Sequence, residues 1–463
     1  MDIITQMTEE MTAKALQLDI GKGIGQFMDE AYAEFKTYIL GLARYKLAVA
    51  DQAILNHKSL RKQWKVCKTN VSRTIQTQFG ALTFGRRYYT HKQVEGKRCY
   101  LLDEYLHIPA YERVDNFLKA KVCALATEYS YEKSSQLACE GAITRQSVKR
   151  IVQQAKEPEL VPVRQRTQVK VIHIQADEDH VALQDGRRST IVKLAVIHEP
   201  PEREETKRIF LPQRFILNSY NETTEDFWLR IADAISARYG DRDDLRIYIH
   251  GDGASWIRQG VEWLPNSVFV LDRYHLQRYL LPLCGGEDSY AKLLWSYIKK
   301  GQLKQLTDVV AALVDTEVCQ KETAQRFLTY VRGNWDGIQV YYDPRHAADK
   351  SCAEGLVSHI LSERLSSRPK GWLDAGLDAV SSLRVYRLNG GEIKPDFFTK
   401  TRHKLRKMPQ QIRAATQTKR AYIPGPSSAL KTPHRSSAYH YIELSNFFPY
   451  LYNVTAAPLL ASA

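Results

Sequence analysis

Apolar residues in the first part of the chain recur every three or four positions, which is the spacing of an amphipathic helix. The segment 27–57 keeps this period without a proline, and the Gly-Lys-Gly-Ile-Gly stretch at 21–25 predicts a break before it. This glycine-rich break lacks the spacing of a Walker phosphate-binding loop. We therefore expect residues 1–62 to form a helical N-terminal region.

The pattern then changes twice before residue 160. Residues 64–102 alternate or are rich in β-branched and aromatic side chains, which predicts a three-stranded antiparallel meander. Residues 111–155 return to helical spacing, with a turn at Gly141 and Thr144 as a candidate N-cap for the helix that follows. This resembles a helix-turn-helix, so residues 63–160 are expected to form a β-meander plus helix-turn-helix that binds DNA.

A proline-containing linker at 154–168 separates this region from a second pattern. From 169 the chain predicts three strands, expected to be antiparallel, and then a helix, a strand, a short helix and a strand. This order is the ribonuclease H arrangement of an α/β sheet. The expected elements are strands at 169–183, 192–198, 208–216, 246–252 and 267–272, and helices at 224–240, 256–264 and 273–281.

The remaining segments complete this division. Residues 169–281 are expected to be the first part of the core, and 282–345 a helical insertion. Residues 346–385 would supply a closing helix with a final glutamate, and 386–463 a basic C-terminal tail.

Charge is unevenly distributed along the chain, whose net charge is +14. Residues 61–170 carry 21 basic and 10 acidic side chains and residues 354–463 carry 16 and 7, whereas residues 171–281 carry 14 and 18. Basic flanks around an acidic middle favour a polyanion such as DNA as partner. A basic protein that binds no nucleic acid is the alternative.

The cysteine and hydropathy patterns predict the cellular compartment of the chain. The seven cysteines form no CxxC pair and no zinc-finger spacing, which favours reduced thiols in a cytoplasm. No apolar run approaches the roughly 20 residues that span a bilayer, and the first residues do not resemble a secretory signal. We expect a cytoplasmic, nucleoid-associated protein without membrane contact.

Basic residues in three places are candidates for DNA contact. Those of the meander lie among tyrosines, as in surfaces that stack bases, although a solvated sheet face is an equal alternative. Those near the start of the second helix of the helix-turn-helix would meet base edges, unless the segment is an ordinary helical hairpin. Those after the closing helix could contact phosphates. The candidates are Arg73, Arg86, Arg87, Arg145, Lys149, Arg150, Arg364 and Arg368.

Acidic residues stand at the ends of the predicted strands. Asp177 lies on the first strand, Asp252 ends the fourth, and Glu354 opens the closing helix. Asp272 and His275 follow the fifth strand. Scattered carboxylates gathered in this way suit two Mg²⁺ ions, which prefer oxygen ligands and stabilise both oxygens of a phosphoryl displacement.

Each of these residues also has an ordinary structural explanation. Asp177 could be a turn residue in Ala-Asp-Glu-Asp, and Glu178 or Asp179 could replace it. Glu363 could replace Glu354. Asp252 could serve merely as a turn residue and Asp272 merely as a helix N-cap. Glu354 could be an ordinary first-turn glutamate that the helix dipole favours, and His275 could be a core or surface histidine.

Six stretches carry a resemblance to the ISLre-type bacterial insertion-sequence transposases, long catalogued as an uncharacterised protein family. They are TQFGALTFGRRYY, YLLDEYLHI, IQADEDHVALQ, IYIHGDGASWI, FVLDRYHL and AEGLVSHILSERLSSRPKGW, within residues 60–385. Asp272 and His275 also resemble an Asp-x-x-His pair of the Mutator-like transposases, in which a helical insertion likewise precedes the final Glu.

The resemblance implies a DDE transposase with a ribonuclease H-like core and Asp177, Asp252 and Glu354 as catalytic, metal-binding triad. Two Mg²⁺ ions, replaceable by Mn²⁺, would serve cleavage at terminal inverted repeats and strand transfer into target DNA. A homo-oligomer is expected, because two element ends must be brought together. The alternatives are a ribonuclease H-like nuclease without strand transfer and a catalytically dead DNA-binding regulator.

Overall fold

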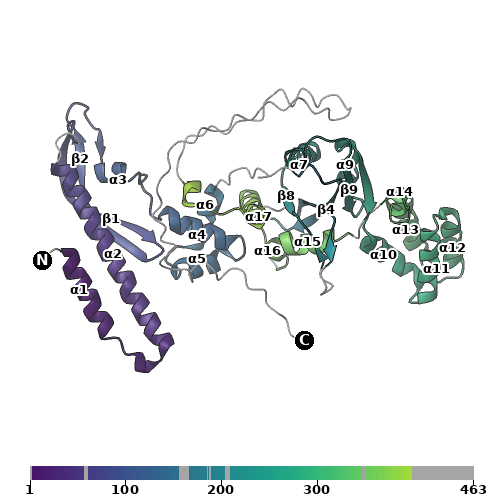
Figure 1. Ribbon diagram of the computed structural model, residues 1–463, viewed down its shortest axis with the longest axis horizontal. Coiled ribbons are helices and arrows are strands. Elements are labelled where there is room, and N and C mark those ends of the chain that lie inside the picture. Colours follow the sequence, from purple (N-terminus) through teal and green to yellow (C-terminus); the bar gives the residue numbers. More distant parts are fainter. Residues whose placement is uncertain are drawn as a thin grey trace. The chain divides into compact units, whose positions relative to one another are not determined.

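A five-stranded mixed sheet forms the centre of the α/β part of the protein (Figure 1). Its strand order is β10-β9-β4-β5-β8; β5 pairs antiparallel with β4 and β8, and β9 pairs parallel with β4 and β10. The central strand is therefore the first in sequence. The strands are β4 (Val171–Val181), β5 (Thr190–His198), β8 (Phe215–Ser219), β9 (Arg246–Gly251) and β10 (Ser267–Leu271).

The computed structural model describes only part of the chain, and the following statements concern that part. The described residues are 3–56, 61–155, 166–184, 186, 189–203, 209–346, 348, 351–368 and 370–398. The expected linker lies largely outside them, as does the expected tail from residue 399 on. Within these ranges no helix combines the length and apolar character needed to cross a membrane.

Alternate residues of the sheet face two hydrophobic cores. Ile172, Ile174 and Ala176 of β4 pack with the helices that follow β8 and β9. Val181 of β4 and Leu194 of β5 face the opposite core, which the closing helices complete. The first layer comprises α7 (Thr224–Tyr239), α8 (Ser255–Arg258) and α9 (Gly260–Trp263). The closing layer comprises α15 (Ala353–Val357), a π-helical turn (Ser358–Ser362), α16 (Glu363–Leu365) and α17 (Asp374–Leu388).

The third strand expected from the sequence, at 208–216, is divided in the structure. Ile209–Phe210 (β7) pairs with Glu202–Arg203 (β6) in a small hairpin, and only β8 joins the main sheet. Pro212 and Gln213, whose φ is 54°, separate the two pieces. Proline has no backbone N–H to donate, and a positive φ turns the chain out of the extended conformation.

Helices between β10 and the closing layer form a core of their own, which contains Leu294, Leu306, Phe327 and Ile338. This helical segment falls where the insertion was expected. It contains α10 (Arg273–Leu280), a 3₁₀ turn (Leu281–Cys284), α11 (Asp288–Lys299), α12 (Leu303–Asp315), α13 (Lys321–Gly333) and α14 (Trp335–Gln339).

The N-terminal helices and the meander are also present. The meander has the order β1-β2-β3 with both pairs antiparallel, and α2 packs on β2. Ile54 of α2, Phe84 and Tyr89 of β2, and Leu102 share one core. The elements are α1 (Ile3–Leu16), a 3₁₀ turn (Ile20–Lys22), α2 (Ile24–Asn56), β1 (Trp64–Thr77), β2 (Gly80–His91), β3 (Arg98–Cys99) and α3 (Leu101–Tyr105).

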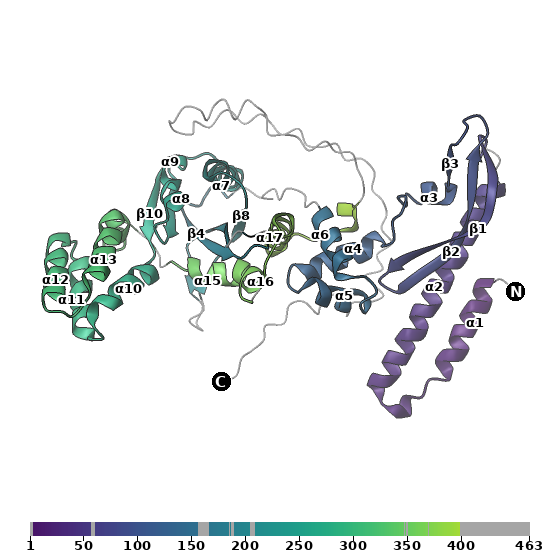
Figure 2. The same cartoon turned by 180° about the vertical axis from the view of Figure 1, so that it is seen from behind.

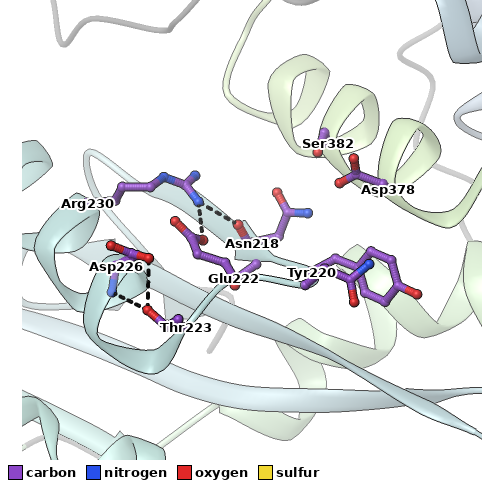
Figure 3. Close-up of a pocket in the computed structure, with 10 residues that line it drawn as sticks. Asn218, Tyr220, Glu222, Thr223, Asp226, Arg230, Asp378 and Ser382 are labelled. Carbon is purple, nitrogen blue, oxygen red and sulfur yellow. Dashed lines mark hydrogen bonds and ion pairs between the residues drawn. The ribbon is translucent and has the colours of Figure 1, made fainter. Parts of the chain in front are cut away.

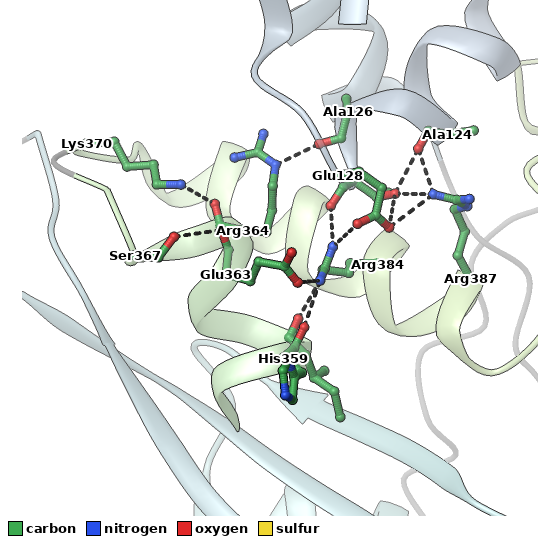
Figure 4. Close-up of polar contacts among 12 residues, drawn as sticks. Ala124, Ala126, Glu128, His359, Glu363, Arg364, Ser367, Lys370, Arg384 and Arg387 are labelled. Carbon is green, nitrogen blue, oxygen red and sulfur yellow. Dashed lines mark hydrogen bonds and ion pairs between the residues drawn. The ribbon is translucent and has the colours of Figure 1, made fainter. Parts of the chain in front are cut away.

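The helix-turn-helix segment packs with the closing helices rather than with the meander's core. Helices α4 (Asn116–Ala126), α5 (Tyr131–Cys139) and α6 (Arg145–Gln154) contribute to the same hydrophobic core as α17. Figure 4 shows the polar contacts at this junction: Arg384 of α17 is buried and binds Glu128, which follows α4. The boundary predicted near residue 160 therefore does not separate the core of α4–α6 from that of the closing helices. Figure 2 shows the same elements from behind. A last 3₁₀ turn spans Pro395–Phe398.

Candidate active site

Asp177 lies on β4, the middle strand, opposite Leu194 of β5. The residue is 6 % exposed, and its Oδ1 accepts a hydrogen bond from the N–H of Glu178 at 2.8 Å. A carboxylate so far removed from water needs a charged partner or a raised pKa.

Asp252 follows β9, the parallel neighbour of β4, so that both acids lie near the middle of the sheet. Its side chain accepts from the N–H of Ala254 at 2.9 Å and stabilises the turn that leads into α8. Gly253 has a φ of 95°, a conformation that a residue with a side chain adopts only with strain. The hydroxyl of Tyr330, from α13, donates to the Asp252 carbonyl at 2.6 Å. The insertion thus contacts this turn directly.

Asp272 and His275 form a linked pair at the end of β10. The Asp272 carboxylate caps α10 by accepting from the N–H of Tyr274, and its second oxygen lies 3.1 Å from Nδ1 of His275. The expected N-cap role and a contact with His275 are therefore combined in one carboxylate. The other ring nitrogen, Nε2, lies 3.8 Å from Oε2 of Glu354.

Glu354 lies in the first turn of α15, which packs on β4. Its side chain is 58 % exposed, in contrast to the buried Asp177. His275 thus connects an acid that follows β10 with an acid of the closing helix.

Electrostatic interactions join these residues into one cluster. Burial is the largest cause that raises the pKa of Asp177 to about 7; the carboxylates of Asp252 and Glu354 act in the same direction, while the Glu178 N–H and His275 oppose them. The hydrogen bond with Asp272 raises the pKa of His275, burial opposes this rise, and the charges of Asp177 and Asp252 add to it. Strongly perturbed pKa values, such as that of Asp177, cluster at functional sites.

The three rival acids have other partners. Glu178 accepts a hydrogen bond from the indole N–H of Trp256 at 2.7 Å. Asp179 accepts from the hydroxyls of Ser362 and Ser366. Glu363 pairs with Arg384 at 3.1 Å. These contacts distinguish Asp177 and Glu354 from their neighbours in sequence.

Asp177, Asp252 and Glu354 agree chemically with a hard divalent cation, because each offers carboxylate oxygens, the donor type that such a cation prefers. Among the described residues, however, no three His, Cys, Asp or Glu side chains form a ready ligand set. Ligation by all three carboxylates therefore requires side-chain movement from these positions.

A separate polar pocket of about 410 Å³ lies beside β8, between the start of α7 and α17 (Figure 3). Asn218 and Asp226 line it, and so does Arg230, which is bound to Glu222 and to the Asn218 carbonyl. Among the described residues that line this pocket, Arg230 is the one Lys or Arg, and its guanidinium is already paired. It contains none of the predicted site residues.

Two meander arginines predicted to contact DNA are buried instead, and this corrects the expectation for them, while a third, Arg87, is half-buried and paired. Arg73 and Arg86 both pair with Asp103, with side chains 8 % and 9 % exposed. Arg87 binds Asp51 of α2. Their periodicity among tyrosines suggested an open surface, but these guanidinium groups link the meander to the helices beside it.

Arg364 is a further correction. It is 6 % exposed and donates to the Ala126 carbonyl at 2.9 Å (Figure 4). Its guanidinium also lies over the Trp372 ring. Burial lowers its pKa to about 10. Its function in this structure is to join the closing helices to α4.

Other candidates remain accessible. Arg145, Arg150 and Arg368 are exposed and Lys149 is half-buried. Thr144 caps α6 through a hydrogen bond to the N–H of Ser147, so the predicted helix start is confirmed. DNA contact by these residues stays a prediction.

Comparison with known proteins shows the family of the chain. The Uncharacterised protein family (UPF0236) matches residues 38–402. The chain belongs to this family. A UPF0236 protein of Caldanaerobacter subterraneus subsp. tengcongensis is 34 % identical over 402 residues, covering 85 % of each chain; its name joins eleven locus designations. A second UPF0236 protein of this bacterium is 35 % identical over 347 residues, covering 74 % of this chain and 73 % of the relative.

Proposed function

We propose that this UPF0236 member is a DDE transposase with a ribonuclease H-like core, which cleaves DNA at element ends and joins the freed ends to target DNA. One observation carries the proposal: Asp177 on the central strand, Asp252 at the end of its parallel neighbour and Glu354 on the packed closing helix interact electrostatically. The strand order, with three leading antiparallel strands and two parallel ones, supports a ribonuclease H-like core.

The chain's own residues have distinct tasks in this proposal. Asp177 and Asp252 would hold metal on the sheet side, and Glu354 from the closing helix. Two bound Mg²⁺ ions would activate the attacking oxygen and stabilise the leaving one. Asp272 orients His275, whose Nε2 lies beside Glu354. This pair would therefore position Glu354, a candidate metal ligand, without itself binding the metal.

DNA would approach along exposed basic groups. Arg145 and Arg150 on α6 and Arg368 after the closing helix are exposed. Because α6 and α17 share one core, DNA bound at α6 would lie on the same packed unit as the helix that carries Glu354. A homo-oligomer that pairs two element ends and an association with the bacterial nucleoid are part of this proposal.

The relatives give independent support. A name that joins eleven loci of one genome is what copying of an element within that genome would produce.

The test is a strand-transfer assay with the full chain, labelled element-end DNA, target DNA and Mg²⁺ or Mn²⁺. We expect cleaved and joined products from the wild type and a loss of at least about a thousandfold with Asp177→Asn, Asp252→Asn or Glu354→Gln, since each removes a metal-holding charge. Asp308→Asn and Glu322→Gln, which alter exposed acids of the insertion, are the matched controls and should be active.

The products distinguish the alternatives. Cleavage without joined products would identify a nuclease that performs no strand transfer. Metal-independent DNA binding without cleavage would identify a regulator. Full activity in the Asp252→Asn variant would overturn the assignment of the acids.

A further inference from the structure

The central strand carries a polar row on the face that meets the closing helices. His173, Gln175, Asp177 and Asp179 occupy every second position of the strand, and all four are at most 6 % exposed. The first three alternate with Ile172, Ile174 and Ala176 of the opposite core. Burying a polar side chain is costly unless it is hydrogen-bonded. The hydrogen-bond partners of these side chains therefore show which segments the row fixes in place.

Gln175 holds the start of the closing helix. Its Oε1 accepts from the backbone N–H of Cys352 at 3.1 Å and from the hydroxyl of Ser351 at 3.2 Å. Cys352 is the N-cap residue of α15, and Glu354 follows two residues later. One amide on β4 thus anchors the turn from which the Glu354 side chain projects.

A histidine fixes the orientation of this amide. His198 Nδ1 lies 2.6 Å from the Glu199 carbonyl, which can only accept, so Nδ1 carries the proton. Nε2 of the same ring then accepts from the Gln175 amide at 3.1 Å. This leaves Oε1 directed at Ser351 and Cys352.

Asp179 holds the far end of the same helical segment. Its Oδ1 accepts from the hydroxyls of Ser362 at 3.0 Å and Ser366 at 2.8 Å. The π-helical turn Ser358–Ser362 follows the Gln175 anchor and ends at Ser362, which belongs to the Asp179 anchor. Such turns are frequent at functional sites. The segment 351–366 is thus bound to β4 on both sides of Asp177.

We propose that Gln175 and Asp179 are positioning residues, which hold the closing helix on β4 on either side of Asp177 and so set the placement of Glu354 relative to Asp177. The consequence for catalysis rests on the proposed function. The two anchors themselves do not, because they are contacts between this chain's own residues.

The first test measures amide hydrogen exchange of residues 352–366 by mass spectrometry on the full chain without metal or DNA. Gln175→Met retains the side-chain length and removes the amide, and Ser362→Ala with Ser366→Ala removes the hydroxyls that bind Asp179. We expect exchange near the altered anchor to become about tenfold faster, as for loss of a buried hydrogen bond. Asp179→Asn retains an acceptor oxygen and should protect the segment nearly as well as the wild type.

Ser367→Ala is the matched control, because this residue follows α16 and its hydroxyl donates to the Glu363 carbonyl of that helix rather than to β4. It should leave the exchange unchanged. The serine variants keep the test informative if Gln175→Met does not fold.

The second test measures the Mg²⁺ concentration for half-maximal DNA cleavage. Altering an anchor should raise this Mg²⁺ concentration about tenfold or more, which is the usual effect of mutating a residue that orients a metal ligand. The affinity for DNA measured without metal should be retained. Unchanged exchange in both anchor variants would overturn the proposal, and so would faster exchange with an unchanged Mg²⁺ requirement. If exchange accelerates but the wild type shows no metal-dependent cleavage, the anchors stand and the proposed function fails.

Discussion

Asp272 binds His275 through a 3.1 Å contact between Oδ2 and Nδ1, and the other oxygen of the same carboxylate caps α10. A single side chain therefore sets both the start of a helix and the orientation of a ring beside Glu354. The two tasks can be separated, because asparagine is as good an N-cap as aspartate but carries no charge.

We expect Asp272→Asn to lower the pKa of His275, since the hydrogen bond with Asp272 is the largest cause that raises it. Helix α10 should remain capped. The measurement is an NMR titration of the His275 ring protons. Asp272→Ala is the contrasting variant: it removes the cap as well and should lower the free energy of unfolding by about 1 kcal/mol. An unchanged His275 pKa in Asp272→Asn would contradict the role of this carboxylate.

A buried histidine group predicts acid-sensitive stability. Burial lowers the pKa of His173 to about 3 and lowers that of His198. In the unfolded chain both rings take up a proton near pH 6.5, so over the window from pH 6.5 down to about 3 the unfolded state binds more protons. The free energy of unfolding should therefore fall as the pH is lowered, by up to about 1.4 kcal/mol per pH unit for each group.

Urea unfolding at a series of pH values measures this slope. His173→Phe retains an aromatic ring in the stack with Tyr248 but removes one titrating group, so its slope should be smaller. His180→Asn changes an exposed histidine and should retain the wild-type slope. Equal slopes for His173→Phe and the wild type would contradict a neutral, buried His173.

Substitution of a buried arginine of the meander should lower the stability of the protein rather than its affinity for DNA. Arg73→Ala leaves Asp103 with one partner fewer and removes hydrogen bonds to two backbone carbonyls, at Pro109 and Glu112. Breaking such a buried pair costs about 3–5 kcal/mol. Chemical denaturation should show this decrease, and a decrease below about 1 kcal/mol would mean that the pair is not buried in solution.

Arg145→Ala should affect DNA binding and leave stability nearly unchanged. This residue is exposed at the start of α6, so the free energy of unfolding should stay within about 0.5 kcal/mol of the wild type. If the side chain contacts a phosphate, the negative slope of log affinity against log salt should become less steep by about 0.9. Affinity measurements on duplex DNA at several salt concentrations give this slope, and an unchanged slope and affinity would remove Arg145 from the DNA-contacting surface.

The positions of the acids could be predicted from sequence because they depend on local patterns. Asp252 and Asp272 stand where apolar strands end, and Glu354 stands where helical spacing begins. The parallel pairing of β4 with β9 then follows from the order of strands and helices. A strand carries no local sign of its partner in space, but the order of elements restricts which strands can be neighbours.

The roles of Arg73, Arg86 and Arg364 could not be predicted in this way. Each is buried by a partner distant in sequence, and local charge density is the same for a buried arginine as for an exposed one. The burial of the polar row on β4 could not be predicted either, because apolar and polar residues alternate in the same way in a strand with one face in solvent. Its partners lie about 180 residues away, which the pattern does not show.

The last prediction concerns the contact between the insertion and the Asp252 turn. The Tyr330 hydroxyl donates to the Asp252 carbonyl, while its ring stacks on Tyr279 with centroids 4.2 Å apart. Tyr330→Phe retains the stacking and removes the hydrogen bond, so the free energy of unfolding should decrease by about 1 kcal/mol. Because the Asp252 turn loses its hydrogen bond to α13, its backbone amides should exchange faster and DNA cleavage should slow about tenfold.

Tyr290→Phe removes a hydroxyl from α11 of the same insertion and is the matched control. Its exchange at residues 252–255 and its cleavage rate should equal those of the wild type. If Tyr330→Phe also equals the wild type in both measurements, the insertion covers the Asp252 turn without positioning it. A slower cleavage together with unchanged exchange would instead indicate that Tyr330 acts on the bound DNA, because the hydroxyl would then be needed only when substrate is present.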